Sequence, residues 1–258
     1  MKLGGFGRIA DYDSIKSSGF DYAELDIPEI TDLAETEFEA FCDKVHSDGF
    51  PVLTGARALP VAEPWFFTEQ FSLDMYRDFI MRACTRAKRL GIRKIILGNG
   101  KARMLPGDNS AALEHNFTGL LRLYAEAADA QGIEIILEPL GPDYSNYINT
   151  LPEAFQVVRK TQMPNLFIMA DLRHMYRSGE TYEDIVEYVD MIHHIHIDYP
   201  DMFPERSFPR KTDGFDYSDF LSALKRSGYS GTLTIEADIP DDWTSAYRNA
   251  VEVLEDIL

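Results

Sequence analysis

Acidic and imidazole side chains stand at the ends of four consecutive apolar segments in the second half of the sequence. Glu138 follows Ile-Glu-Ile-Ile-Leu, Asp171 follows Leu-Phe-Ile-Met-Ala, His196 lies near the end of Ile-His-His-Ile-His-Ile, and Glu236 follows Thr-Leu-Thr-Ile. Three carboxylates that converge unpaired repel one another unless protons or a cation neutralise them. Mixed oxygen and nitrogen ligation with three carboxylates favours Mn²⁺ or Mg²⁺ over a structural zinc. These residues therefore predict a site for a divalent ion.

Two alternatives to a metal site stay open. Taken singly, an acidic residue just past a strand is commonly a helix cap or a solvated loop residue. A nearby arginine, such as Arg173, could also neutralise the carboxylates in place of a metal. We favour the metal site because four consecutive segments bring three carboxylates and an imidazole to the same end of the predicted strands.

The segments that must position these residues repeat one pattern, an apolar run followed by a turn and an amphipathic stretch. The apolar runs have the length of strands and alternate little, which is typical of parallel strands covered on both faces. They span Lys2–Phe6, Phe20–Leu25, Pro51–Thr54, Lys94–Leu97, Ile133–Leu137, Leu166–Ala170, His194–Ile197 and Thr232–Ile235. Between them, helical spacing relates Phe79, Ala83, Ala87 and Leu90, and likewise Leu113, Phe117, Leu120, Tyr124 and Ala128.

Eight strand-then-helix units in 258 residues match the number and size expected of a single α/β domain, a (β/α)₈ TIM barrel over residues 1–258. A doubly wound open sheet is the structural alternative, because periodicity does not establish closure. However, the first turn, Gly4-Gly5-Phe6-Gly7, lacks the spacing of a dinucleotide-binding fingerprint. In a TIM barrel the C-terminal ends of the strands face the active site, so the four residues above would meet at one rim.

The composition limits the partners and the compartment. The chain has 43 Asp and Glu against 25 Lys and Arg, a formal net charge of −18. This charge disfavours nucleic acid, because duplex binding is driven largely by Lys and Arg. Two cysteines, Cys42 and Cys84, are too few for a disulfide framework, and neither a membrane-spanning run nor a secretion signal is recognised. We therefore expect a cytoplasmic protein without a nucleic acid or membrane partner, and a homo-oligomer stays open.

The motifs around the four residues resemble the metal-binding signature of the xylose isomerase-like barrels. That superfamily contains sugar isomerases, ketose 3-epimerases, inosose dehydratases and the endonuclease IV group. The resemblance is carried by Glu138-Pro-Leu, Asp171-Leu-Arg-His174, His194-Ile-His196 and Thr-Ile-Glu236, and it covers about residues 133 to 237. It implies that Glu138, Asp171, His196 and Glu236 hold one divalent ion, with Mn²⁺ expected first and Mg²⁺, Co²⁺ or Zn²⁺ as alternatives.

The same resemblance implies an activity, that of a sugar isomerase or epimerase with a small carbohydrate as substrate. Such enzymes remove a proton α to a carbonyl, and the metal stabilises the resulting enediolate. Glu138 and Glu236 would abstract and return the proton, and His174 would orient the substrate beside them. Two bases on opposite faces give epimerisation, whereas one base with a relay gives aldose–ketose isomerisation. His194 would point the same way as His196, one layer deeper in the barrel.

Two positions differ from the sugar 3-epimerases of that superfamily. Those enzymes have a second glutamate six residues after the strand-five ligand, where this chain has Tyr144. They also carry an arginine in a glycine-rich stretch after the strand-seven histidine, whereas this chain has a proline-rich stretch that contains Arg206 and Arg210. Tyr144, Arg206 and Arg210 are therefore candidate substrate contacts, and the arginines suit a phosphate or carboxylate. A solvated loop with ordinary surface cations is the alternative to such contacts.

These differences keep a second activity open, a metal-dependent dehydratase or lyase that acts on a keto-sugar or glycoside at the same site. A nuclease of the endonuclease IV kind is disfavoured, because that group uses many more histidines than the six of this chain. A non-catalytic barrel that keeps the ligands is a further alternative. Lys101 and Arg103, after the fourth apolar run, are additional candidates for contacting an anionic substrate.

Overall fold

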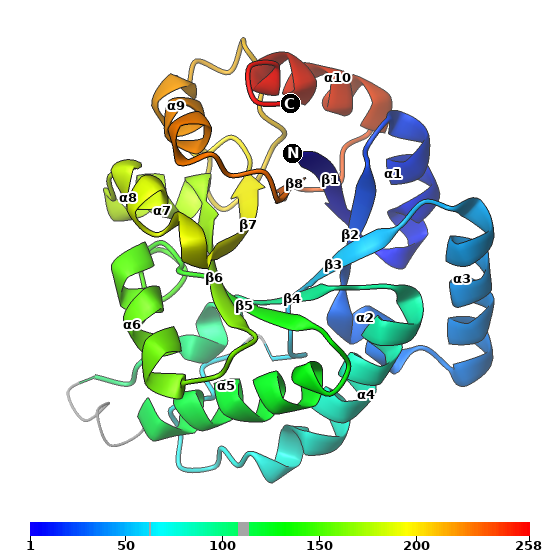
Figure 1. Ribbon diagram of the computed structural model, residues 1–258, viewed down its shortest axis with the longest axis vertical. Helices are drawn as coiled ribbons and strands as arrows, with labels where there is room; N and C mark the ends of the chain where they lie inside the picture. Colours follow the sequence, from blue (N-terminus) through cyan, green and yellow to red (C-terminus); the bar gives the residue numbers. More distant parts are fainter. Residues whose placement is uncertain (62, 108–113) are drawn as a thin grey trace.

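The computed structural model describes residues 1–61, 63–107 and 114–258. Eight parallel strands form a closed barrel in chain order, and β1 pairs with β8 through Gly5 and Ile235. The strands are β1 (Lys2–Gly7), β2 (Tyr22–Asp26), β3 (Val52–Ala56), β4 (Lys94–Leu97), β5 (Glu134–Leu137), β6 (Leu166–Asp171), β7 (Ile192–Ile197) and β8 (Thr232–Ile235). Figure 1 shows them encircled by the helices. Closure confirms the predicted (β/α)₈ barrel and excludes the open sheet.

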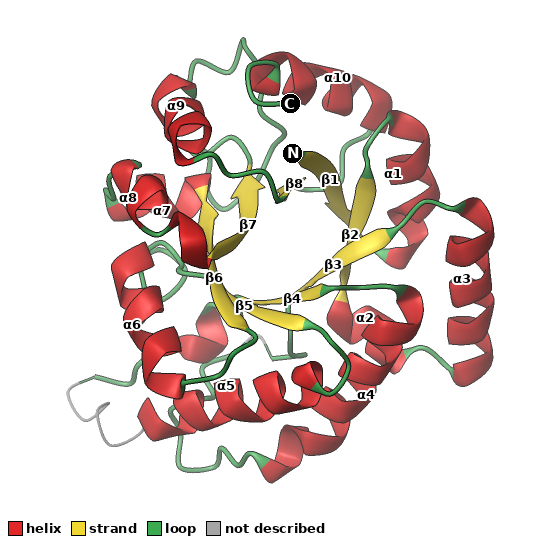
Figure 2. Ribbon diagram, in the orientation of Figure 1, coloured by secondary structure: helices red, strands yellow, loops and turns green. Residues whose placement is uncertain are grey.

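The helices form the outer layer, which the secondary-structure colouring of Figure 2 separates from the strands. They are α1 (Tyr12–Ser18), α2 (Ile27–Asp32), α3 (Glu35–Asp48), α4 (Asp74–Leu90), α5 (Glu114–Asp129), α6 (Leu151–Thr161), α7 (Leu172–Ser178), α8 (Glu183–Glu187), α9 (Ser218–Ser227) and α10 (Trp243–Leu254). The predicted faces of α4 and α5 are buried against the barrel, as expected of amphipathic helices. Leu113 lies outside the described residues.

All eight predicted strands are present, and only their ends differ. β7 begins at Ile192, two residues before the predicted start, and β3 continues to Ala56, two residues past the predicted end. Alternation of inward and outward side chains then decides the interior of the barrel. An apolar cluster of Ile96, Ile136 and Met169 fills the side formed by β4, β5 and β6.

The side of the interior formed by the remaining strands carries polar groups. Glu24, Thr54, His194, His196 and Thr234 are buried there, from β2, β3, β7 and β8. Polar side chains are seldom fully buried unless they bond to one another, so this half of the interior requires an internal hydrogen-bond network. The layered arrangement places the network directly beneath one side of the barrel mouth.

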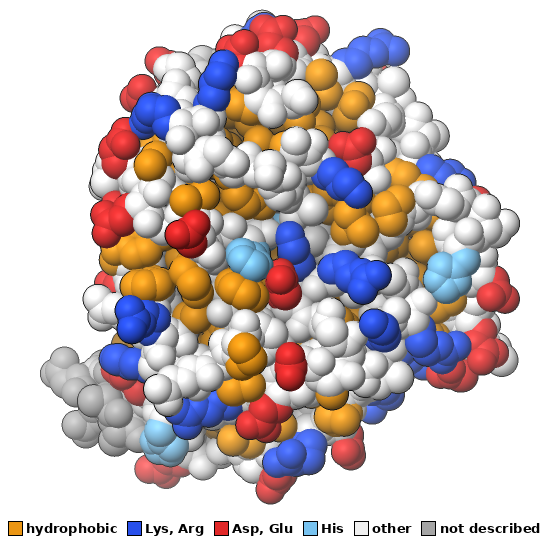
Figure 3. All heavy atoms as spheres, in the orientation of Figure 1, with side chains coloured by type: hydrophobic (Ala, Val, Ile, Leu, Met, Phe, Trp, Pro, Cys, Tyr) orange, Lys and Arg blue, Asp and Glu red, His pale blue; other side chains and the backbone are white. Residues whose placement is uncertain are grey.

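The remaining expectations from composition concern the surface and the helices. Cys42 on α3 and Cys84 on α4 are buried free thiols. Within the part of the chain that the structure describes, no helix has the length and apolar character required to cross a bilayer. Figure 3 shows Lys and Arg side chains interspersed with Asp and Glu over the face drawn there.

Candidate metal and substrate site

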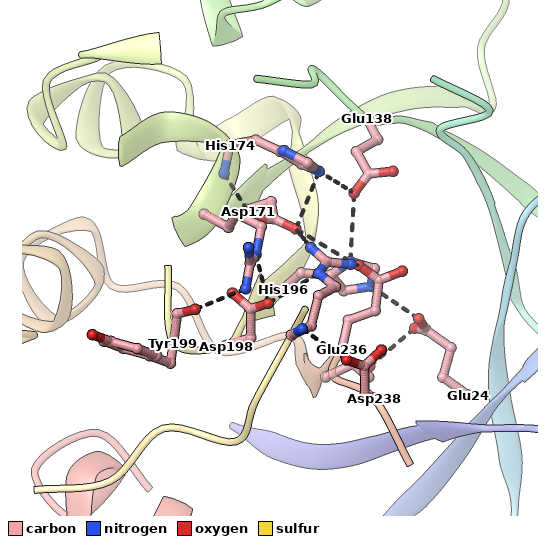
Figure 4. Close-up of polar contacts among 12 residues, drawn as sticks. Glu24, Glu138, Asp171, His174, His196, Asp198, Tyr199, Glu236 and Asp238 are labelled. Atoms are coloured by element: carbon pink, nitrogen blue, oxygen red, sulfur yellow. Dashed lines mark hydrogen bonds and ion pairs between the residues drawn. The ribbon is translucent and has the colours of Figure 1, made fainter. Parts of the chain in front are cut away.

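The four predicted ligand residues lie together at the C-terminal mouth of the barrel. Glu138 directly follows β5, Asp171 ends β6, His196 lies in β7 and Glu236 directly follows β8. One potential ligand atom from each lies within 4.8 Å of those of the others. The Nδ1 atom of His196 faces all three carboxylates, at 3.4 Å from Glu236 Oε2 and 3.6 Å from both Glu138 Oε1 and Asp171 Oδ2. Figure 4 shows these side chains pointing toward one another.

The cluster contains buried polar atoms that the protein does not satisfy. Glu138 Oε1 and His196 Nδ1 have no hydrogen-bond partner among the described residues. Leaving a buried polar atom unpaired costs about 1–3 kcal/mol, and more for a charged group. A divalent cation would satisfy both atoms at once, and carboxylate oxygens with one imidazole nitrogen are suitable donors for it. The donor set therefore fits the ion that the sequence predicts.

The carboxylates of the cluster differ in their protonation. Burial raises the pKa of Glu138 to about 7, and the neighbouring charge of Glu236 adds to the effect. Burial alone would raise the pKa of Glu236 as well, but the Arg206 guanidinium and the adjacent His196 together outweigh it and hold that pKa below its usual range. The two glutamates that face His196 Nδ1 thus have different affinities for a proton. Such a difference is what an acid–base pair needs.

Arg206, rather than Arg173, is the cation at the edge of the cluster. Its guanidinium pairs with Glu236 and lies 3.5 Å from Asp171 Oδ2. Its Nε donates to Asp198 Oδ2 over 2.9 Å. With Glu138 ionised and His196 neutral, the three mouth carboxylates and this guanidinium have a net charge of −2, which one divalent cation would balance. Arg206, a predicted contact for a substrate anion, is thus bonded to carboxylates of the protein itself.

Arg173 has a structural position instead. It is fully buried, and its Nε donates to Asp198 Oδ2 over 2.7 Å. Its terminal nitrogens donate to the backbone oxygens of Tyr199 over 2.7 Å and of Met202. The side chain of Arg173 therefore holds the backbone of the loop after β7 in place, and the same loop positions Arg206 beside the cluster. Of the alternative to a metal site, neutralisation by a nearby arginine, the structure excludes Arg173, whose donors are occupied by Asp198 and these carbonyls, and places Arg206 against Glu236 and Asp171.

His174 and Tyr144 lie beside the cluster. The Nε2 atom of His174 is 3.7 Å from Glu138 Oε1 and 3.8 Å from Asp171 Oδ2. Burial lowers the pKa of His174 to about 4, so its imidazole is neutral near pH 7. The ring of Tyr144 contacts that of His174 edge to face, with centroids 4.8 Å apart. The Tyr144 hydroxyl and His174 Nδ1 are both buried and have no hydrogen-bond partner in the described ranges.

A cavity of about 480 Å³ opens above the cluster. Its lining combines Glu138, Glu236 and His174 with the cations Arg57, Lys101 and Arg206 and with apolar or aromatic side chains, including Leu140, Tyr144 and Phe203. This volume lies within the range of small-molecule sites, which are mostly apolar with a few convergent polar groups. The cavity can hold a small polar molecule against the cluster of three carboxylates and one imidazole.

Two of the predicted substrate contacts lie away from this cavity. Arg210 is exposed, and its backbone N–H donates to Asp213 over 2.8 Å while its side chain faces a different hollow. Arg103 is fully buried and donates to the backbone oxygens of Glu138 over 2.8 Å and Ile148 over 3.3 Å. Arg103 therefore supports the chain after β5, and the expectation that it meets a substrate anion is wrong. Lys101 does line the cavity.

One buried residue of this region, Glu24, was not expected from the sequence. It lies in β2 beneath the mouth, where His196 Nε2 is 2.9 Å from Glu24 Oε1 and His194 Nε2 is 3.0 Å from Glu24 Oε2. His194 thus occupies the predicted deeper layer. The signal for Glu24 was the sequence Tyr22-Ala-Glu-Leu-Asp, in which an acidic residue interrupts an apolar strand. A fully buried glutamate is rare unless it is paired.

Comparison with known proteins places this geometry among relatives. The sequence profile of the xylose isomerase-like TIM barrel family matches residues 12–257. The 3-dehydro-D-guloside 4-epimerase of Escherichia coli is 23% identical over 92% of this chain and 90% of its own length. Inosose isomerase of Halalkalibacterium halodurans is 23% identical over 56% of this chain, and the match spans 53% of that relative.

Solved structures agree on the fold. The apo 3-keto-D-glucoside 4-epimerase of E. coli superposes with a TM-score of 0.81 at 20% identity, over 99% of both chains. The IOLI protein, solved with a bound zinc atom, superposes with a TM-score of 0.79 at 18% identity, over 100% of this chain and 99% of that one. At these identities the superpositions establish the architecture alone.

Proposed function

Because the chain belongs to the xylose isomerase-like TIM barrel family, we propose that it is a divalent-metal-dependent sugar isomerase or epimerase. The observation that carries this proposal is the cluster of three carboxylates and one imidazole, with ligand atoms within 4.8 Å of one another beneath a cavity. The names of the relatives, epimerases and isomerases of sugars and inososes, support the same class of reaction. The substrate would be a small carbohydrate with a carbonyl group.

Glu138, Asp171, His196 and Glu236 would hold one ion, for which their donor set favours Mn²⁺. When bound, the ion supplies the positive charge that polarises a substrate carbonyl and makes the adjacent C–H more acidic. The unsatisfied atoms of Glu138 and His196 and the two negative charges left by Arg206 are the features of this chain that match such an ion.

Glu138 and Glu236 are proposed to move the substrate proton. Arg206 keeps Glu236 ionised, so a Glu236 oxygen can accept a proton from the carbon next to the carbonyl. Glu138, on the other side of the ligand set, could then return a proton to that carbon. The neutral imidazole of His174 would orient a substrate hydroxyl between them. Two bases on opposite sides of the substrate would give epimerisation.

A dehydratase or lyase is the second candidate, and Tyr144 is the observation that favours it. Tyr144 lines the cavity, its buried hydroxyl has no hydrogen-bond partner among the described residues, and burial raises its pKa above the usual value. A hydroxyl that keeps its proton can protonate a departing oxygen. Elimination would then follow removal of the α-proton at the same site.

The test follows hydrogen exchange in D₂O. Mn²⁺-loaded protein is incubated with a panel of keto-sugars and 3-keto-glycosides, and products are identified by NMR. Deuterium incorporated at the carbon next to the carbonyl, with no water or aglycone lost, supports the isomerase or epimerase. Loss of water or aglycone supports the lyase instead. Glu138→Gln should abolish exchange, whereas Glu134→Gln, four residues earlier on β5, should not. A Glu138→Gln protein with bound metal and full exchange would remove Glu138 from the proposed role.

A further inference from the structure

The imidazole of His196 faces a different carboxylate group with each of its nitrogens. Nδ1 faces the three carboxylates at the mouth, at 3.4–3.6 Å. Nε2 is hydrogen-bonded to Glu24 Oε1 at 2.9 Å, from the opposite direction and one layer deeper. Figure 4 shows Glu24 on the far side of the His196 ring from Glu138. The ring therefore bridges the mouth and the interior of the barrel.

Coordination of an ion by His196 requires a lone pair on Nδ1, and the ring proton must then be on Nε2. An ionised carboxylate can only accept hydrogen bonds, so Glu24 stabilises that tautomer and disfavours the other one. We infer that Glu24 is a positioning residue, which holds His196 in the Nε2-protonated tautomer and in the ring orientation that presents Nδ1 to a divalent cation. The inference rests on the proposed function only for the presence of that cation.

Glu24 is itself fixed by donors from other strands. Its Oε2 accepts from the hydroxyls of Thr54 over 2.7 Å and Thr234 over 3.0 Å. Because the proton of Thr234 goes to Glu24, the 2.7 Å contact between Tyr22 and Thr234 is donated by the Tyr22 hydroxyl. A side chain held by groups from β3 and β8 has one available orientation. The direction of its bond to His196 is then set by the barrel and not by the ligand.

Glu24, His194 and His196 could also be regarded as a second metal site, since one ligand atom of each lies within 4.8 Å of the others. The contacts argue against it. Both oxygens of Glu24 already accept hydrogen bonds, and His194 Nε2, which makes no hydrogen bond among the described residues, lies 3.0 Å from one of those oxygens. His196 would have to supply a lone pair on Nε2 as well as on Nδ1, which requires loss of both ring protons. A single ion per chain is therefore expected.

The first experiment measures binding of Mn²⁺ alone by calorimetry, on metal-free wild-type protein and two variants. Glu24→Gln keeps the shape of the side chain, but its amide can also donate and no longer selects one tautomer. We expect its Kd to rise about 10- to 100-fold, as for other residues that orient a metal-ligating histidine. Tyr22→Phe is the matched control, because it removes a hydroxyl from the same buried network without touching His196. It should lower the melting temperature and leave the Kd within about twofold.

A Glu24→Gln protein that folds and binds Mn²⁺ as tightly as wild type overturns the inference, as do two ions per wild-type chain. If Glu24→Gln does not fold, the wild-type protein suffices. In Zn²⁺-loaded protein labelled with ¹⁵N-histidine, NMR should show His196 protonated at Nε2 and metal-bound at Nδ1, and the reverse assignment refutes the inference. Wild-type protein that binds Mn²⁺ with this dependence on Glu24, yet catalyses no deuterium exchange, refutes the proposed function alone.

Discussion

The mouth of the barrel and the interior just beneath it hold the same kinds of residue in different states. At the mouth, Glu138 and His196 each leave an atom unbonded among the described residues, beside a cavity. In the interior, the oxygens of Glu24 accept bonds from Thr54, Thr234 and His196. His196 belongs to both groups. The difference shows that the identity of the residues does not define a ligand site, whereas unsatisfied atoms that converge beside a cavity indicate one.

The largest expected effect tests whether the carboxylates at the mouth of the barrel require a cation, which is the main difference between the mouth and the interior. Asp171→Asn removes one of the three carboxylates but can keep the cap on α7, where Asp171 Oδ1 accepts from the His174 N–H over 3.1 Å. We expect Mn²⁺ affinity and turnover to fall by more than about 100-fold, beyond the loss seen for residues that merely orient ligands. Mn²⁺ should raise the melting temperature of wild type and not that of the variant. The exposed Asp190→Asn is the control, and an unchanged Mn²⁺ shift in Asp171→Asn would contradict the assignment.

The two arginines of the loop after β7 test how far the mouth extends. Arg206→Gln removes the guanidinium that pairs with Glu236 and Asp198, and we expect kcat/KM to fall about 10- to 100-fold, since bonds to charged groups contribute about 1.5–3 kcal/mol. Loss of a neighbouring positive charge should at the same time tighten Mn²⁺ binding. Arg210→Gln, outside the cavity, should change neither quantity more than about twofold. Equal effects of the two substitutions on steady-state kinetics would place Arg206 among ordinary surface cations.

Tyr144 tests whether a neutral group beside the cavity also contributes to substrate binding or turnover. Tyr144 lines the cavity and its hydroxyl is unbonded among the described residues, so if the hydroxyl meets the substrate, Tyr144→Phe should raise KM or lower kcat about tenfold, the value of one hydrogen bond to a ligand. Tyr176→Phe on α7 is the control, since that side chain is largely exposed and its hydroxyl is 3.5 Å from Asp201. Kinetics of both variants with the same substrate decide the matter, and a Tyr144→Phe enzyme with wild-type constants would show that its hydroxyl meets no substrate group.

Glu180 tests whether one unsatisfied carboxylate is enough to require a cation. Its Oε1 accepts from the Leu151 N–H over 2.7 Å, while Oε2 is unbonded within the described residues. Burial raises its pKa to about 8, so Glu180 can avoid the cost of a buried unsatisfied charge by taking up a proton. Protonation favours the folded state, and this contribution is complete below the unfolded pKa near 4.5 and is lost as the pH rises through about 8.

Glu180→Gln should therefore match wild type in stability at pH 4.5 and exceed it by on the order of 1–2 kcal/mol at pH 9. Urea unfolding at the two pH values measures the difference. A difference that is the same at both values would show that Glu180 does not titrate in this range. Glu180 differs from the mouth in the number of carboxylates. One buried carboxylate can be neutralised by one proton, whereas three converging carboxylates would need several protons or a cation.

Much of the fold and of the ligand set could be predicted from the sequence, because both depend on local patterns. Strand-length apolar runs fix β5 to β8, and the residue that ends each run has only one rim to occupy once the barrel closes. Glu24 escaped prediction because its bond to His196 joins residues 172 positions apart, and such a pair depends on closure and strand register. The position of Arg206 could not be predicted for a related reason. The path of its loop depends on the hydrogen bonds of Arg173, which lies far from the loop in sequence.

The way Arg173 fastens the loop after β7 has a consequence for how selectivity could change over generations. The backbone around Tyr199 and Met202 is tied to a fully buried side chain, whereas Phe203, on the same loop, is 47% exposed and faces Tyr144. The backbone of this loop is hydrogen-bonded to Arg173, whereas the exposed part of Phe203 can be exchanged without touching those bonds. Substitution of Phe203 should therefore change the shape of the cavity entrance without moving the carboxylate cluster. A new substrate preference could then arise from a single substitution that leaves the fold intact.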